Sequence, residues 1–89
     1  MNGNNSTDLQ SKTGRIFLAE NLRYLRKSHH LTQQQAGSLL GVTKDAISKW
    51  ETGKRSPDIL AAQKLADFYQ VDLKAILYTD LEQKEERPS

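Results

Sequence analysis

The chain has 89 residues, of which 36% are hydrophobic and 27% charged, and this length allows one small domain with a modest core and no second, ligand-sensing domain. It has no cysteine, which excludes disulfide bonds and a cysteine zinc site and makes a reducing cytoplasm the expected location. No apolar run is long enough to predict a signal peptide or a membrane span.

The net charge of +2 is unevenly distributed along the chain. Residues 21–55 hold seven Lys or Arg against two acidic residues, a balance of +5, whereas residues 56–89 hold four against seven, a balance of −3. A basic segment beside an acidic one fits a molecule with one face toward phosphate and the other toward solvent or a partner. Ordinary surface charge is the alternative interpretation.

The beginning of the chain predicts a tail followed by a helix. Residues 1–13 are rich in Asn, Ser, Thr and Gly and show no periodicity, so we expect them to be flexible. A first helix is predicted from about Arg15 to near His29. Its apolar stripe follows the spacing i, i+4 and i+7, at Leu18, Leu22 and Leu25.

Two further helices are predicted on either side of a tight turn. Thr32 suits an N-cap, and the glutamine-rich run after it favours a second helix to about Leu40. Gly41 stands where a left-handed residue ends a helix, and Thr43 can cap a third helix over residues 44–51. Helices joined by so short a turn cross steeply. Their contact needs one small and several apolar side chains, supplied by Gly37, Ile47 and Trp50.

The second half of the chain predicts two more helices and a charged end. Ser56, Pro57 and Asp58 are expected to be the N-cap, the first helical residue and an early acid of a fourth helix. A fifth, short helix follows, and residues 79–89 predict a charged, frayed tail. The fold class is therefore all-α, a compact five-helix bundle over residues 14–78. The apolar positions of its last two helices are Ile59, Ala62, Ala66, Tyr69, Leu73, Ile76 and Leu77.

The segment from Leu31 to Pro57 resembles the helix-turn-helix of the phage repressor and Cro-like (Xre-type) family of DNA-binding domains. The resemblance extends from about Arg15 to Tyr78 and implies a lambda-repressor-like fold. One departure is that Ala36 and Gly37 stand where the family usually has a larger apolar residue followed by alanine, and a glycine costs a helix about 1 kcal/mol relative to alanine. The matching stretches are Leu31-Thr32-Gln33, Gly41-Val42-Thr43, Ile47-Ser48-Lys49-Trp50-Glu51 and Gly53-Lys54-Arg55-Ser56-Pro57.

The resemblance implies that the third helix lies in the major groove of DNA, with Ile47 and Trp50 facing inward. Lysine can donate to guanine O6 and N7, and Asp45 can accept from the N4 amine of cytosine, which implies a half-site that contains G·C pairs. Alternatively, Asp45 only supports the helix N-terminus through the helix macrodipole. The implied base-reading positions, with one residue of the same helical phase, are Lys44, Asp45, Lys49 and Ser48.

Other residues correspond to family positions that hold the DNA backbone or orient the reading helix. An ion pair between Arg26 and Glu51 is expected to join the first helix to the end of the third. For Lys54 and Arg55, the alternative is that they lie in a solvated loop after Gly53 and do not contact DNA. The expected phosphate contacts are Gln33, Thr43, Lys54 and Arg55.

An enzyme is not expected, because no nucleophile with a base, no carboxylate pair and no metal cluster can be recognised. His29 and His30 are adjacent at a helix end and lack a third ligand at metal spacing, so we expect neither a metal nor a cofactor. The absence of an apolar span also argues against a membrane partner.

The resulting hypothesis is a bacterial or phage transcriptional regulator, a repressor that binds an inverted-repeat operator in double-stranded DNA as a homodimer. An antitoxin-like or adaptor protein, whose main role is binding a protein partner, is the alternative. Family dimers meet near the end of the fourth helix and at the fifth. The dimer contact is therefore expected at Tyr69, Leu73, Ile76 and Tyr78.

Overall fold

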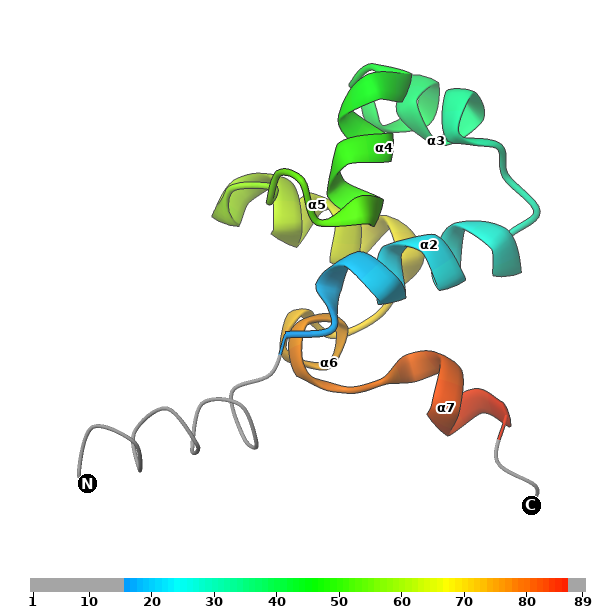
Figure 1. The fold of residues 1–89 in the computed structure, drawn as a ribbon, viewed down its shortest axis with the longest axis vertical. Coiled ribbons are helices and arrows are strands. Elements are labelled where there is room, and N and C mark those ends of the chain that lie inside the picture. Colours follow the sequence, from blue (N-terminus) through cyan, green and yellow to red (C-terminus); the bar gives the residue numbers. More distant parts are fainter. Residues whose placement is uncertain (1–15, 87–89) are drawn as a thin grey trace.

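The computed structural model describes residues 16–86, and the flexible tail predicted over residues 1–13 lies outside this range. The described residues form helices without strands, so the predicted all-α class is confirmed (Figure 1). There are six helices in this range instead of five, because part of the predicted C-terminal tail is helical. They are α2 (Leu18–Ser28), α3 (Gln33–Leu40), α4 (Lys44–Thr52), α5 (Ile59–Tyr69), α6 (Leu73–Tyr78) and α7 (Leu81–Glu86).

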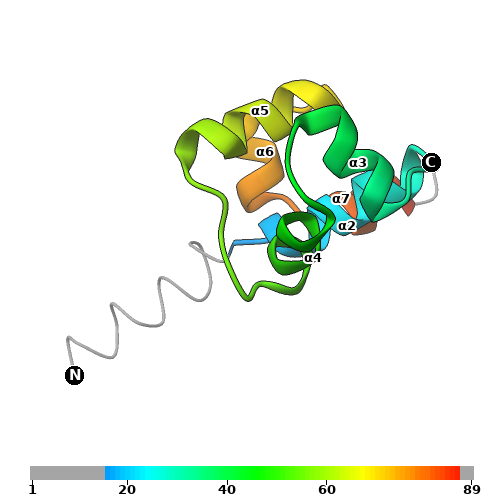
Figure 2. The ribbon, with the colours of Figure 1, turned by 90° about the horizontal axis from the view of Figure 1, so that it is seen from above.

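The helices α3 and α4 form one end of the molecule, α6 and α7 lie toward the other, and α2 runs between them (Figure 1). Seen from above, α4 and α5 lie on opposite sides (Figure 2). The core between the helices is apolar and draws on five of the six. Its buried members are Leu18, Leu22, Leu25, Ala36, Leu40, Ile47, Leu65, Ala66, Tyr69 and Ile76.

The first helix begins later than the sequence predicts. The backbone N–H of Phe17 donates to the carbonyl oxygen of Leu77, 2.7 Å away, so the chain at this point is bonded to α6. The helix α2 starts at Leu18, and the three leucines of its predicted apolar stripe are all buried. The i, i+4, i+7 spacing therefore identified the buried face correctly.

A buried polar residue fastens the C-terminal part of the fold to α2. Asn21 is fully buried, and its Nδ2 atom donates to the carbonyl oxygens of Ile76 and Thr79, both at 2.7 Å. Its Oδ1 atom accepts from the backbone N–H of Leu81 at 3.1 Å. The side chain thus provides hydrogen-bond partners for backbone carbonyl groups at the end of α6 and for a backbone N–H group at the start of α7. Residues 81–86 are helical where the sequence predicts a frayed tail, and Oδ1 of Asp80 accepts from the backbone N–H of Gln83 in their first turn at 3.3 Å.

The turn between α3 and α4 has the predicted caps. Thr32 forms a capping box with Gln35, because its side chain accepts from the Gln35 backbone while the Gln35 side chain accepts from the Thr32 backbone. Gly41 has a φ of 77°, the left-handed conformation expected of it. The side chain of Thr43 accepts from the backbone N–H of Ala46 at 3.0 Å and caps α4.

Gly37 has a packing reason for departing from the family pattern. A Cβ atom at this position would lie 2.7 Å from the carbonyl oxygen of Val42. The backbone N–H of Val42 also donates to the Gly37 carbonyl oxygen at 2.9 Å, so the chain returns directly over this residue. Glycine therefore permits the close approach of α3 to the turn, which offsets its poor helix propensity.

The start of α5 differs from the prediction. The N-cap is Asp58, whose Oδ1 atom accepts from the backbone N–H of Ala61 at 2.8 Å, and both Ser56 and Pro57 precede the helix. The assignment of Ser56 as the cap was wrong because the carboxylate two residues later reaches the free N–H groups of the first turn. Ile59 was also wrongly placed on the apolar face, since it is 67% exposed. The other three predicted positions on α5 are buried.

Candidate nucleic-acid interface

The helix α4 presents one face to the core and the opposite face to solvent. Ile47 is 3% exposed, and the half-buried Trp50 packs against the core, as expected for the inward-facing residues. The spacing of residues 44, 45, 48 and 49 along α4 places four polar side chains on its outward side. This face contains the four predicted base-reading residues, with Lys44 and Asp45 exposed and Ser48 and Lys49 partly exposed. We call these four residues the reading face.

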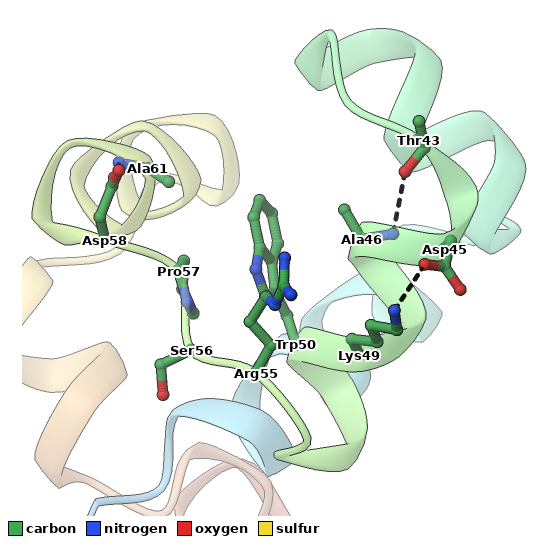
Figure 3. Close-up of a pocket in the computed structure, with 10 residues that line it drawn as sticks. All are labelled: Thr43, Asp45, Ala46, Lys49, Trp50, Arg55, Ser56, Pro57, Asp58 and Ala61. Atoms are coloured by element: carbon green, nitrogen blue, oxygen red, sulfur yellow. Dashed lines mark hydrogen bonds and ion pairs between the residues drawn. The ribbon is translucent and has the colours of Figure 1, made fainter.

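Two residues of the reading face form an ion pair with each other. The Nζ atom of Lys49 lies 3.0 Å from Oδ2 of Asp45 one turn earlier, and the side chains are 42% and 73% exposed (Figure 3). This pair is not among the contacts expected from the sequence, although an acid four residues before a lysine is the favourable helical arrangement. Asp45 also lies in the first turn of α4, where its charge suits the helix macrodipole.

A second ion pair joins α4 to α2, between the two residues that the resemblance pairs. Nε of Arg26 donates to Oε2 of Glu51 at 2.7 Å, and Nη2 donates to Oε1 at 3.0 Å, so the contact is bidentate. Both residues are buried, at 8% and 9% exposure. The pair ties the last turn of α4 to α2, and the direction of α4 is thereby constrained at the end remote from its N-cap.

Additional hydrogen bonds complete the surroundings of this buried pair. Nη1 of Arg26 donates to the carbonyl oxygen of Leu31 at 2.7 Å, and Nε2 of Gln33 donates to Oε1 of Glu51 at 3.2 Å. The Gln33 amide was expected to contact phosphate, and the structure instead directs one of its two N–H donors at the carboxylate. The other donor of this amide stays available for a further partner.

The buried ion pair and its surroundings shift the pKa values of two groups. The hydrogen bond to Glu51 raises the pKa of the Arg26 guanidinium above its ordinary value, against the opposing effect of burial. Burial raises the pKa of Tyr69 from 10.0 to about 12, and the carboxylate of Glu51 adds to this effect while Arg26 opposes it. The Arg26 guanidinium therefore remains charged at every physiological pH, and Tyr69 remains neutral.

The remaining predicted phosphate contacts flank the reading face. Thr43 lies at its N-terminal end, where the hydroxyl oxygen caps α4 and the hydroxyl proton can still be donated. Lys54 and Arg55 are exposed in the loop after α4, which begins with the left-handed Gly53. The backbone N–H of Arg55 donates to the carbonyl oxygen of Lys49 at 3.3 Å and holds this loop against the helix.

A hollow of about 340 Å³ lies between α4 and the start of α5. In Figure 3, the side chain of Arg55 extends over it beside the indole of Trp50, while Asp45 and Lys49 lie along the outer side of α4. Trp50 therefore contacts the core with part of its ring and borders this hollow with another. The lining residues are Thr43, Asp45, Ala46, Lys49, Trp50, Arg55, Ser56, Pro57, Asp58 and Ala61.

The predicted dimer contact requires a correction. Tyr69 is 5% exposed and Ile76 is 0% exposed, so both belong to the core and cannot meet a second molecule. Their positions are apolar because they close the bundle, which the sequence pattern alone does not distinguish from an interface. Leu73 is half-buried and Tyr78 is 48% exposed, so these two are the accessible residues of the predicted set.

No group of three or more His, Cys, Asp or Glu residues that could hold a metal ion occurs among residues 16–86. The exposed ring of His29 lies 5.2 Å from that of Tyr69, which is a packing contact. In the same range, no helix is both long enough and apolar enough to cross a membrane.

Together, two helices joined by a short turn, the capped second helix and its outward polar face define a helix-turn-helix domain. A family model described as helix-turn-helix matches residues 22–76. The chain belongs to this Cro/C1-type helix-turn-helix family, whose members are DNA-binding transcriptional regulators and not enzymes.

Curated relatives and solved structures agree with this assignment. The transcriptional activator BcrR of Enterococcus faecalis is 38% identical over 58 residues, which cover 65% of this chain and 28% of BcrR. The uncharacterized regulator YqaE of Bacillus subtilis is 33% identical over 68 residues, covering 76% of this chain and 59% of YqaE. The chain therefore spans only part of the length of these two relatives.

Two solved structures illustrate the fold. The P22 c2 repressor, in complex with a synthetic operator, has 28% identity and a TM-score of 0.66, covering 71% of this chain and 96% of that one. A transcriptional regulator from Listeria innocua has 27% identity and a TM-score of 0.66, covering 80% of this chain and 72% of that one. The compact all-helical arrangement is thus shared with known repressors and regulators.

Proposed function

We propose that this protein is a sequence-specific regulator of transcription that binds double-stranded DNA through the reading face of α4. The observation that carries the proposal is the combination of an exposed polar reading face with a buried ion pair that fixes the direction of the same helix. A helix of this kind enters the major groove, where each base pair presents a distinct pattern of donors and acceptors.

The phosphate contacts in this proposal surround the reading face. The hydroxyl of Thr43 and the second amide donor of Gln33 serve one side of the groove, and Lys54 and Arg55 serve the other. Each cation that neutralises a phosphate contributes about −0.9 to the slope of log affinity against log salt. We assign base reading to Lys44, Asp45, Ser48 and Lys49, and we assign the orientation of α4 to Arg26 and Glu51.

Repression by occupancy is the proposed mode of action. A regulator that only covers an operator needs no contact with polymerase, and the P22 c2 protein with the same fold is named a repressor. The relative BcrR is named an activator, so a promoter fusion decides between the two signs. We expect lower reporter output when the protein is expressed in the cytoplasm of cells whose reporter promoter carries the operator. Higher output would make it an activator.

A homodimer on an inverted repeat is the proposed assembly, because one such domain contacts too few base pairs for useful genomic specificity. We keep Leu73 and Tyr78 of the predicted contact, since both are accessible to a second copy. If this surface is correct, Tyr78→Asp abolishes cooperative binding to the repeat and leaves binding to a single half-site unchanged. A matched variant, Leu60→Asp, alters a residue that is 79% exposed on α5 and serves as the control.

Selection of bound duplexes from a randomised DNA pool, at near-physiological salt, tests the proposed function. We expect enrichment of an inverted repeat whose half-sites are about 10 base pairs apart, the spacing of successive major grooves on one side of the duplex. Retention of duplexes without any enriched sequence would reduce the interaction to charge and contradict the proposal.

A protein-binding role is the second candidate, and one observation favours it. Ile59 and Leu60 are 67% and 79% exposed on consecutive positions of α5, an apolar surface that DNA reading does not require. An antitoxin-like or adaptor protein would use such a surface for a partner. Failure of the DNA selection, together with a defined complex that Leu60→Asp disrupts, would place this role first.

A further inference from the structure

The ion pair on the reading face has the geometry of a hydrogen-bonding unit that is already assembled. Nζ of Lys49 and Oδ2 of Asp45 are 3.0 Å apart, and both side chains are open to solvent on the outer side of α4 (Figure 3). Within residues 16–86, neither side chain has another hydrogen-bonding or ionic partner. A donor and an acceptor are thus held side by side on the helix proposed to enter the groove.

We propose that Asp45 and Lys49 read a single G·C base pair as one unit, with Lys49 on the guanine and Asp45 on the cytosine of the same pair. This inference rests on the proposed function, because it requires α4 to lie in the major groove. It differs from reading by two independent side chains, which would contact two different base pairs.

Both side chains can make the required bonds without separating. The lysine ammonium has three N–H donors, of which the ion pair uses one, so two are left for guanine O6 and N7. The aspartate carboxylate has two oxygens with about four acceptor positions, so it can accept from cytosine N4 while it still contacts Lys49. The exposed pair is also weakly held, which lets it adjust to the base edge.

The two groups of the pair are complementary to the two halves of the edge that they would contact. In a G·C pair, guanine O6 accepts from cytosine N4, so an acceptor and a donor lie about 2.9 Å apart at the centre of the groove. The second hydrogen of N4 points into the groove and is free. Because the lone pairs of O6 and this free hydrogen point away from each other, Oδ2 of Asp45 can stay beside the Lys49 ammonium on guanine while Oδ1 accepts from cytosine N4.

The arrangement of groups along the edge explains why other base pairs fit less well. Toward the major groove, G·C presents two acceptors and then a donor, whereas A·T presents an acceptor, a donor and an acceptor. On A·T, the lysine loses one of its two acceptors. In the reversed orientation, C·G, the carboxylate faces the guanine acceptors, and two sets of lone pairs repel each other. The unit therefore specifies both the base pair and its orientation.

The pairing also accounts for a carboxylate on a surface that approaches phosphate. An isolated aspartate beside the DNA backbone is repelled by it, whereas Lys49 cancels the charge of Asp45 within 3.0 Å. Asp45 can then contribute specificity without the full electrostatic penalty. Removal of Lys49 has two effects, since it deletes the guanine contact and also leaves Asp45 uncompensated.

The test is a mutant cycle in which the enriched site from the wild-type selection is varied one base pair at a time. The proteins are the wild type, Asp45→Ala, Lys49→Ala and the double variant, with Lys44→Ala as the control on the same face. The measured quantity is the ratio of affinities for the parent and the changed site, because a ratio is insensitive to the change in overall charge. Thermal unfolding of each variant checks that the fold is retained.

We expect both single variants to lose discrimination at one and the same G·C pair, by about 5- to 100-fold, and to keep it elsewhere. The double variant should lose no more at that pair than the worse single variant, because the two residues act together. Lys44→Ala should affect a different pair. Additive losses at two separate pairs, or an unchanged profile for Asp45→Ala, would overturn the inference while the proposed function stands. Failure of the wild type to enrich any site would overturn both.

Discussion

The helix α4 carries two ion pairs of the same chemical type in opposite surroundings. Glu51 meets Arg26 between α4 and α2, where both residues are less than a tenth exposed and the contact is bidentate. Asp45 meets Lys49 on the outer side of α4, where the side chains are 73% and 42% exposed. The first pair holds the helix, whereas the second is available to a partner of the helix.

This difference shows why burial matters more than the presence of an ion pair. Two charges removed from water must satisfy each other, and the loss of one leaves the other without compensation in the interior. Two charges in water are each solvated, so separating them changes the stability of the protein little. The buried pair is therefore a constraint on geometry, and the exposed pair can exchange its partner for a base edge.

Removal of one buried partner should have the largest effect on stability. Glu51→Ala leaves Arg26 buried without its carboxylate, and we expect it to lower the free energy of unfolding by about 3 to 5 kcal/mol. Denaturant unfolding measures this loss. The double variant Arg26→Met/Glu51→Leu, which removes both charges and keeps an apolar volume, should lose much less. A loss of less than about 1 kcal/mol for Glu51→Ala would show that the pair does not constrain the fold.

Alkaline pH should weaken the same region through Tyr69. Its folded-state pKa of about 12 lies above its ordinary value of 10.0, so the folded protein holds the phenol proton more tightly than the unfolded chain. The associated stability is complete below pH 10 and is lost as the pH rises toward 12. The expected decrease is about 2 to 3 kcal/mol.

Unfolding measured across this pH range, for the wild type and for Tyr69→Phe, isolates the contribution of the phenol from that of the lysines. The wild type should lose more stability than the variant, and the difference should develop between pH 10 and 12. Equal losses in the two proteins would mean that the phenol titrates normally.

We expect the loss of the exposed ion pair between Asp45 and Lys49 to have a small effect on stability and a larger effect on DNA recognition. Lys49→Ala should change the free energy of unfolding by less than about 0.5 kcal/mol, because its ion pair lies in water. The same variant should weaken discrimination at the contacted base pair by about 1 to 3 kcal/mol. Unfolding and competition-binding experiments on one preparation measure both quantities.

Lys54→Ala is the matched control for Lys49→Ala, since both remove one exposed or partly exposed lysine near the end of α4. We expect it to weaken binding to all sequences similarly and to reduce the magnitude of the salt slope by about 0.9. If the two variants produced the same sequence-independent loss, the separation of the reading face from the phosphate-contacting loop would be wrong.

The elements with local signals could be predicted from the sequence. Thr32, Gly41 and Thr43 mark the ends of α3 and α4 because capping depends on residues only a few positions apart. The leucine stripe of α2 likewise depends on helical periodicity alone. The all-α class and the position of the helix-turn-helix follow from these signals.

The features that sequence reasoning missed depend on contacts distant in the chain. Asn21 binds the backbone at Ile76, Thr79 and Leu81, and no local pattern identifies partners so distant in the chain. Burial also separated Tyr69, in the core, from Tyr78, near the surface, although both belong to similar apolar patterns. The Asp45 and Lys49 pair was the exception, since its i, i+4 spacing was visible.

Methylation interference on the selected duplex tests most directly whether the reading face enters the major groove. Methylation of guanine N7 blocks a major-groove acceptor without altering the phosphates. We expect methylation of guanine in each half-site to abolish binding by the wild type and to have a much smaller effect on Lys49→Ala, which no longer contacts the guanine. Binding that is insensitive to methylation of every guanine in the site would contradict major-groove reading by α4.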